Sequence, residues 1–336
     1  MGKNVRRPDD EQELIGERSE WDILQRIFPR LPESRFALLG PGDDAAVLAA
    51  PDGRYVVTTD MMVHGPDFRL AWSSPEDLGW KAAATNLADV AAMGAVPTAL
   101  VVAIAMPREL SLSTVEGIAD GFRQACDALA PGCGVVGGDL STSTVLTVAV
   151  TAFGDLEGRS PVRRSGARPG DTLALAGKMG AAARGIRLLF DEAVDPLTGE
   201  PDQKLAESLR LAHADVIAAQ LRPVPPIAAG SSAAQAGATA MLDISDGLAL
   251  DARRLADASG VSLWLDSEQL GPNPQTALRG GEDHSLLATF PPNSDLPLDF
   301  HPIGRVREGS GIWVDGELFT ERGGWDPYLE WDGRAG

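Results

Sequence analysis

The stretch from Ser74 to Gly94 constrains most strongly what this 336-residue chain can fold into. Ser74 can cap a helix, Pro75 suits its first turn, and Gly94 can end it in the left-handed conformation. The six alanines between these ends let other backbones approach the helix closely. Asn86 and Asp89, three residues apart, share one face of this largely apolar helix. A carboxylate in such a place is either solvated or bound to a ligand, and Asp89 alone does not decide between the two.

The composition is that of a folded, acidic protein. Hydrophobic residues make up 44% of the chain and charged residues 23%, and its length is enough for two domains. No apolar run is long enough to span a bilayer, so we expect a cytoplasmic protein that does not bind membranes. Cys126 and Cys133 have neither zinc-site nor redox-pair spacing. A formal net charge of −19 argues against a nucleic-acid surface and leaves room for divalent cations.

Strands and helices alternate along the chain, with one interruption. The segment 155–171 is rich in glycine, proline and arginine, and it indicates a domain boundary. We expect strands at 55–60, 99–106, 135–139, 145–153, 172–176, 239–244, 261–265 and 285–290, and helices at 17–28, 74–94, 112–130, 180–190, 204–221 and 248–260. This pattern predicts a fold of the α+β class, in which helices and strands are mixed. Its parts are a flexible tail at 1–15, an N-terminal domain at 16–155 and a C-terminal domain at 156–336.

Six aspartates from both halves of the chain lie mostly at the ends of these elements. They are Asp44, Asp60, Asp89, Asp139, Asp243 and Asp246. Brought together, unpaired carboxylates repel and resist ionisation, a penalty that divalent cations remove. Carboxylate ligands without histidine or cysteine favour Mg²⁺, which completes its shell with water and substrate phosphates. The pattern therefore predicts phosphoryl transfer from a nucleotide, although each aspartate taken singly is also explained as a turn carboxylate or helix cap.

The segment from Gly177 to Gly180 resembles a phosphate-binding P-loop only superficially. Thr172 stands where that motif has its first glycine, and Met179 replaces the residue that would hold magnesium. A glycine turn at a helix N-terminus can still meet an anion. Taken one by one, the basic residues of these segments are expected to be solvated surface charges: Lys81, Arg164, Arg168 and Lys178.

A series of motifs resembles the thiamine-monophosphate kinase family over about residues 16–330. In chain order they are Gly-Asp-Asp-Ala (42–45), Thr-Thr-Asp-Met (58–61), the run 81–95, Gly-Gly-Asp (137–139), Arg-Ser-Gly-Ala-Arg-Pro-Gly-Asp (164–171), Asp-Ile-Ser-Asp-Gly-Leu (243–248), Gly-Gly-Glu-Asp (280–283) and Gly-Trp-Asp (324–326). The run 81–95 and the Asp-x-Ser-Asp-Gly pair are the most specific. The resemblance implies the two-domain aminoimidazole ribonucleotide synthetase-like fold. In that fold an N-terminal β-sheet with helices dimerises, and an α/β domain follows.

The same resemblance implies an activity and a set of site residues. The activity is ATP-dependent phosphorylation of thiamine monophosphate to the diphosphate by a homodimer with several Mg²⁺ ions, the nucleotide lying near the N-terminal junction. Because the acceptor is already an anionic oxygen, we expect direct, in-line transfer of the γ-phosphoryl group. The implied metal ligands are Asp44, Thr58, Thr59, Asp60, Asp89, Asp139, Asp243 and Asp246, of which Asp89, Asp139 and Asp243 are the catalytic candidates. Gly138, Asp139, Arg164 and Ser245 would contact the nucleotide. Asp67, Glu282 and Trp325 would lie on the substrate side, where an aromatic ring and a carboxylate suit a flat cation.

One position differs from the family pattern, and two other functions stay open. The family usually has a His-Phe pair where this chain has Asp67 and Phe68, and an ionised aspartate cannot donate a hydrogen bond. A purine-biosynthesis cyclo-ligase of the same superfamily remains an alternative, although the motif at Trp325 argues against it. A non-catalytic nucleotide-binding protein would keep the fold, but it would have little reason to keep so many carboxylates.

Overall fold

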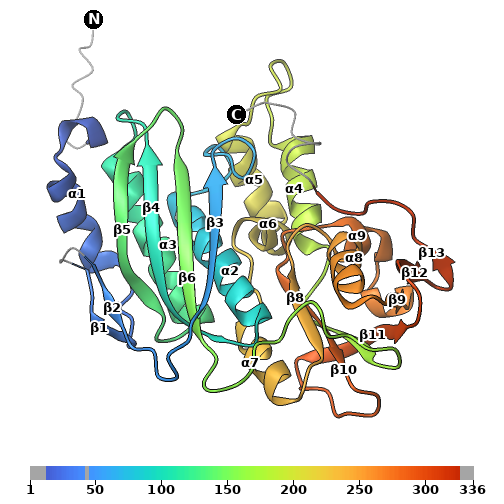
Figure 1. The fold of residues 1–336 in the computed structure, drawn as a ribbon. Coiled ribbons are helices and arrows are strands. Elements are labelled where there is room, and N and C mark those ends of the chain that lie inside the picture. Colours follow the sequence, from blue (N-terminus) through green and yellow to red (C-terminus); the bar gives the residue numbers. More distant parts are fainter. Residues whose placement is uncertain (1–12, 42–44, 326–336) are drawn as a thin grey trace, which may run out of the picture.

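The chain forms two main sheets, one from each half of the sequence (Figure 1). The computed structural model describes residues 13–41 and 45–325. The first sheet has four strands in the order β3-β6-β4-β5, and the second has seven in the order β13-β12-β9-β11-β7-β10-β8. The predicted mixed α/β fold is confirmed. No helix within the described ranges is both long and apolar enough to cross a membrane.

The N-terminal sheet has one face covered by helices. Its strands are β3 (Val56–Val63), β4 (Val96–Met106), β5 (Gly134–Thr142) and β6 (Thr147–Asp155), and only β4 and β5 pair in parallel. Behind the sheet in Figure 1 lie α2 (Pro75–Ala92) and α3 (Leu112–Leu129). Before it come η2 (Ile15–Glu17), α1 (Glu20–Ile27), η3 (Phe28–Arg30), β1 (Ala37–Leu39) and β2 (Val47–Leu48).

The helix α2 has the ends and the packing that its sequence predicts. The Ser74 hydroxyl accepts a hydrogen bond from the Asp77 amide (3.2 Å), and the Ser74 amide donates to the Asp77 carboxylate (2.9 Å). Gly94 has a φ of 73° at the other end. A Cβ on Gly79 would overlap the backbone of Ile118 in α3. The small residues therefore allow the two helices to touch backbone to backbone.

The C-terminal half surrounds its sheet with six helices among the described residues. The strands are β7 (Thr172–Ala176), β8 (Ala240–Ile244), β9 (Ser262–Leu265), β10 (Ser285–Phe290), β11 (Phe300–Arg307), β12 (Ile312–Val314) and β13 (Glu317–Leu318). The helical elements are α4 (Ala181–Glu192), α5 (Gln203–Ala212), α6 (Ala214–Leu221), α7 (Ile227–Gln235), α8 (Leu248–Ser259), α9 (Pro274–Arg279) and the short η4 (Ser267–Leu270). The single helix expected at 204–221 is therefore wrong, because the chain leaves helical geometry at His213, whose φ is −133°.

The two halves meet at α2. Gly230 of α7 packs so closely on α2 that an added Cβ would overlap the carbonyl oxygen of Ala91. Met241 of β8 and Phe290 of β10 belong to the same apolar core as the N-terminal helices. This packing brings the carboxyl end of β8 beside α2 and the edge strand β3. Most of the predicted metal ligands come from these three elements.

Candidate active site

Acidic residues from β3, α2 and β8 form one cluster. The Thr58 hydroxyl donates to Oδ2 of Asp89 (2.7 Å), and the Asp60 amide donates to the side-chain oxygen of Asn86 (3.2 Å). These two bonds hold β3 against α2. Asp243, at the end of β8, is close enough to act electrostatically on both Asp60 and Asp89.

The electrostatics of this cluster are those of uncompensated carboxylates. Burial, followed by the charges of Asp243 and Asp60, raises the pKa of Asp89 to about 7. Burial and then Asp243 raise the pKa of Asp60 as well, with a smaller effect of Asp246. Each ionised group disfavours the next, so the cluster favours binding of a cation.

The oxygen atoms of this cluster are suitable ligands for magnesium, although the side chains that the structure describes are too few to surround the ion. Within residues 13–41 and 45–325, no three His, Cys, Asp or Glu side chains stand close enough together to hold a metal by themselves. Carboxylates and a threonine hydroxyl are the hard oxygen ligands that Mg²⁺ prefers, and Mg²⁺ takes several further ligands from water and substrate phosphates. Asp44 lies outside the described residues.

A cavity of about 840 Å³, here called the acidic cavity, opens on this cluster. Thr58, Asp89 and Asp243 line one part of it, and Arg163 and Arg164 line another. Both arginines are exposed and form no ion pair with any residue in the described ranges. The cavity thus contains both carboxylates and arginines, which suits a phosphate chain that bridges cations and guanidinium groups.

A second cavity of about 430 Å³, here called the aromatic cavity, contains the substrate-side candidates. Asp67, Glu282 and Trp325 line it together with Phe190 of α4. Ser245 also lines it, only two residues beyond Asp243 in the acidic cavity. Residues 243–245 therefore connect the two cavities along the chain.

Glu282 forms an ion pair with a buried lysine, which the sequence does not predict. Its Oε2 contacts Nζ of Lys81, whose side chain is only 6% exposed. The expectation that Lys81 is a solvated surface charge is wrong, because its position on α2 faces the C-terminal half. Burial opposes ionisation of Glu282, but Lys81 and His284 outweigh it and lower the pKa of the carboxyl group. Gln220 completes the group, since its side-chain oxygen can accept from Lys81 (3.1 Å).

The residues after Glu282 fix two other parts of the structure. Asp283 accepts hydrogen bonds from the amides of Gly180 (2.6 Å) and Ala182 (2.9 Å) at the start of α4. The anion expected at this glycine turn is thus a carboxylate of the protein itself. His284 lies 3.3 Å from Asp243, a contact that no sequence pattern signals.

Asp246 is held by partners of its own. Arg254 of α8 donates to its Oδ2 (2.6 Å) and also to Asp251 (2.6 Å). Asp251 accepts in turn from the amides of Asp246 (3.0 Å) and Gly247 (3.1 Å), so it supports the turn between β8 and α8. Burial is the main reason that the pKa of Asp251 rises to about 6. Sequence patterns did not identify Asp251 or Arg254.

Two predicted ligands, Asp139 and Thr59, are not brought to the cluster within one chain. Thr59 alternates along β3 with Thr58 and Asp60 and faces the other side of the sheet, and Asp139 is farther away.

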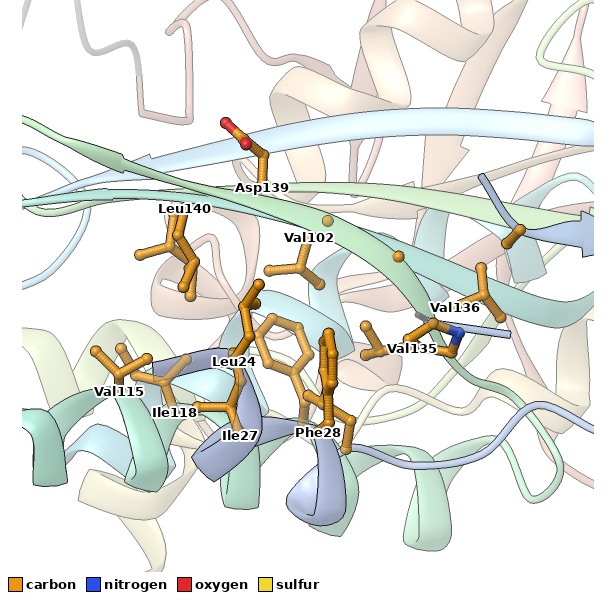
Figure 2. Close-up of a pocket in the computed structure, with 18 of the residues that line it drawn as sticks. Leu24, Ile27, Phe28, Val102, Val115, Ile118, Val135, Val136, Asp139 and Leu140 are labelled. Atoms are coloured by element: carbon orange, nitrogen blue, oxygen red, sulfur yellow. The ribbon is translucent and has the colours of Figure 1, made fainter. Parts of the chain in front are cut away.

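Asp139 lies on β5, at the opposite edge of the sheet from β3. Figure 2 shows its side chain pointing away from an apolar cavity of about 410 Å³ between the sheet and residues such as Phe28 and Ile118. Gly138 borders the same cavity, and an added Cβ there would overlap the carbonyl oxygen of Val102.

Asp139 instead shares the uncovered face of the sheet with exposed apolar side chains. In the strand register, Asp139 pairs with Ala103, Ala103 with Ala149, and Ala149 with Met61, which is 61% exposed. Residues paired across strands point to the same face. On that face, the Thr59 hydroxyl donates to the carbonyl oxygen of Val150 (3.0 Å).

Comparison with known proteins identifies the family. The AIR synthase related protein, N-terminal domain family matches residues 42–156. The thiamine-monophosphate kinase of Mycobacterium tuberculosis is 40% identical over 341 residues, which cover 97% of this chain and 96% of the relative. This chain belongs to the thiamine-monophosphate kinase family.

Solved structures of thiamine-monophosphate kinases have the same fold. That of the Stenotrophomonas maltophilia protein is 33% identical, with a TM-score of 0.72, and the match covers 90% of this chain and 98% of the other. The structure of AaThiL, the Aquifex aeolicus protein, complexed with AMPPCP and TMP is 34% identical, with a TM-score of 0.69 and coverages of 84% and 90%.

Asp67, the position that departs from the expected His-Phe pair, lies shortly after the end of β3. Its carboxylate accepts a hydrogen bond from the Val63 amide (2.7 Å), which ties it to the end of β3. Burial is the main cause of its raised pKa, with a smaller contribution from Glu282. The position therefore presents a second acid to the aromatic cavity, beside Glu282.

Proposed function

We propose that this protein uses ATP to phosphorylate thiamine monophosphate to thiamine diphosphate. The observation that carries the proposal is the pairing of two adjoining cavities. One has Asp89, Asp243 and Arg164 for phosphates, and the other has Glu282 and Trp325 for a flat cation. AMPPCP is an ATP analogue, so its presence with TMP in AaThiL supports ATP as the donor.

The aromatic cavity suits the rings of thiamine. The thiazolium ring carries a positive charge, which Glu282 and Asp67 complement, and both rings are flat enough to stack on Trp325 or Phe190. The Lys81 ion pair fixes Glu282 at the cavity wall. With the rings held there, the phosphate of the substrate points toward Ser245 and the acidic cavity.

The transfer needs no covalent intermediate with the protein. The acceptor is already an anionic phosphate oxygen, which attacks the γ-phosphorus in line as the bond to the β,γ-bridging oxygen breaks and ADP leaves. Asp60, Asp89, Asp243 and Thr58 would hold Mg²⁺, which neutralises the donor and acceptor phosphates when bound. Arg164 would bind the donor phosphates from the other side of the cavity.

A homodimer would bring Asp139 to the site. The uncovered face of the N-terminal sheet exposes Val57 (55%) and Met61 (61%), an apolar surface on which a second sheet can pack. Asp139 lies on this face, so in such a dimer it faces the partner. We propose that the domain at 16–155 provides this interface and binds ATP and Mg²⁺.

Charge placed on this face is expected to prevent dimerisation. The Met61→Glu variant buries an unpaired carboxylate in the proposed interface, and we expect it to sediment as a monomer at concentrations where the wild-type protein is a dimer. Leu211→Glu, at a side chain that is 89% exposed on α5, is the control. A dimer that survives the Met61 substitution would place the interface elsewhere.

Two neighbouring arginines provide a test of nucleotide binding. Arg164 lines the acidic cavity, whereas Arg168, four residues later and equally exposed, does not. Loss of a charged hydrogen bond to phosphate is expected to raise the KM for ATP roughly 10- to 100-fold in Arg164→Ala. Arg168→Ala is expected to stay within about twofold, as measured by initial rates at varied ATP. Equal effects of the two substitutions would contradict the assigned role of Arg164.

The function itself is tested by product analysis. Protein, Mg-ATP and thiamine monophosphate are incubated together, and ADP and thiamine diphosphate are separated by chromatography. Equimolar formation of both products supports the proposal. ATP consumption without thiamine diphosphate would indicate another enzyme of the superfamily, and binding of ATP without turnover would indicate a nucleotide-binding protein.

A further inference from the structure

The mechanism described above gives no role to His284, a buried histidine beside the acidic cluster. Its side chain is 4% exposed, and its Nδ1 lies 3.3 Å from Oδ2 of Asp243. A carboxylate that binds a metal ion only accepts hydrogen bonds, so Nδ1 is the atom that would donate in this contact. We propose that His284 is a positioning residue that fixes the Asp243 carboxylate for magnesium binding, an inference that rests on the proposed function.

The backbone of this segment is held in an uncommon conformation. His284 has a φ of 50° and Glu282 a φ of 70°. Residues other than glycine seldom adopt such angles, and they persist where surrounding contacts enforce them. Three successive side chains supply those contacts: Glu282 binds Lys81, Asp283 caps α4, and His284 meets Asp243. The position of His284 is therefore fixed independently of a bound ion.

Packing alone does not explain a histidine at this position. Its Nε2 is buried and has no hydrogen-bond partner among residues 13–41 and 45–325. An apolar side chain would fill the space without leaving a buried polar atom unpaired. The contact made by Nδ1 is thus the better reason for the histidine.

The Asp243 carboxylate needs such a contact because of its neighbours. When they are ionised, Asp60 and Asp89 repel the Asp243 carboxylate electrostatically. This repulsion favours orientations that turn the Asp243 carboxylate away from them. A donor bonded to Oδ2 of Asp243 opposes this rotation and keeps the ligand in place before the ion arrives. Loss of an outer contact of this kind typically weakens metal binding by about 10- to 100-fold.

Two substitutions separate positioning from packing. Asparagine and glycine both tolerate a positive φ, but only asparagine places an N–H group near the position of Nδ1. We expect His284→Asn to bind Mn²⁺ within about threefold of the wild-type dissociation constant, and His284→Gly to bind it about 10- to 100-fold more weakly. Binding of Mn²⁺ to the nucleotide-free dimer is measured by calorimetry, with circular dichroism to verify folding. His301→Asn, on an exposed part of β11, is the control and should not change Mn²⁺ binding.

The outcomes distinguish this inference from the proposed function. If folded His284→Gly binds Mn²⁺ as tightly as the wild type, or if His284→Asn is as weak as His284→Gly, the inference is overturned. Should His284→Gly not fold, His284→Gln takes its place, because its amide reaches the Nε2 position and not that of Nδ1. Failure of the wild-type protein to bind Mn²⁺ would also overturn the inference. Failure to form thiamine diphosphate despite normal Mn²⁺ binding would instead reject the function.

Discussion

The Asp89→Asn variant is expected to lose kcat by roughly 10²- to 10³-fold while its metal-free form becomes more stable than the wild type. Asparagine keeps the shape of the side chain and removes the charge that would bind magnesium. It also removes a buried charge and its repulsion from Asp243 and Asp60, since burial and these two charges raise the pKa of Asp89 to about 7. Activity and stability therefore change in opposite directions.

The pH dependence follows from the direction of this shift. Between about pH 4 and pH 7 the folded protein keeps a proton on Asp89 that the unfolded chain has released. The wild type therefore loses stability as pH rises through this window, and Asp89→Asn does not. We expect the gap to reach about 2 kcal/mol near pH 7 and to stay constant above it, after allowance for solvent screening.

Thermal unfolding in EDTA and in Mg²⁺ measures this prediction directly. Mg²⁺ is expected to raise the Tm of the wild type more than that of Asp89→Asn, since only the wild type keeps every proposed magnesium ligand. Asp127→Asn, an exposed residue near the end of α3, is the matched control. Near-normal turnover in Asp89→Asn would refute its assignment as a metal ligand.

Local patterns predicted the elements of this fold better than their arrangement. The helix around Asp89 was predictable because its capping residues and glycine act within one turn of each end. The same rules missed the break at His213, where no proline or glycine marks the end of α5. They also did not predict β11 to β13, although the mixed α/β class was correct.

The site was predictable where carboxylates interrupt otherwise apolar elements, and not where it depends on strand order. Asp60, Asp89 and Asp243 lie together as expected. Asp139 also ends an apolar run, but strand order puts β5 at the far edge of the sheet, and no local pattern encodes that order. Helical periodicity likewise shows on which face of α2 Lys81 lies. It does not show that this face packs on the C-terminal half, where Glu282 forms an ion pair with Lys81.

The ion pair of Lys81 and Glu282 predicts an asymmetry between two substitutions. The Lys81 side chain is 6% exposed, whereas that of Glu282 is 42% exposed. Glu282→Ala leaves a buried ammonium group with Gln220 as its remaining acceptor, and we expect a loss of about 3 kcal/mol in the free energy of unfolding. Lys81→Met leaves a carboxylate that water can reach, so we expect a loss of only about 1 kcal/mol.

Both substitutions are expected to raise the KM for thiamine monophosphate, for different reasons. Glu282→Ala removes the charge that we propose faces the substrate, whereas Lys81→Met leaves that charge without a fixed position. Because Lys81 lowers the pKa of Glu282, the stabilisation is present above the ordinary glutamate pKa and is lost as pH falls through the lowered value. The stability deficit of Glu282→Ala should therefore disappear in acid.

Urea unfolding of both single variants and of the double variant measures the coupling between the two residues. The double variant should be less destabilised than the sum of the singles, since no buried charge then lacks a partner. Asp191→Ala is the control, because its pair with Arg187 is exposed (62% and 83%) and should contribute less than about 0.5 kcal/mol. If Lys81→Met lost more free energy of unfolding than Glu282→Ala, the prediction would be contradicted. The glutamate, and not the lysine, would then be the charge that is costly without its partner.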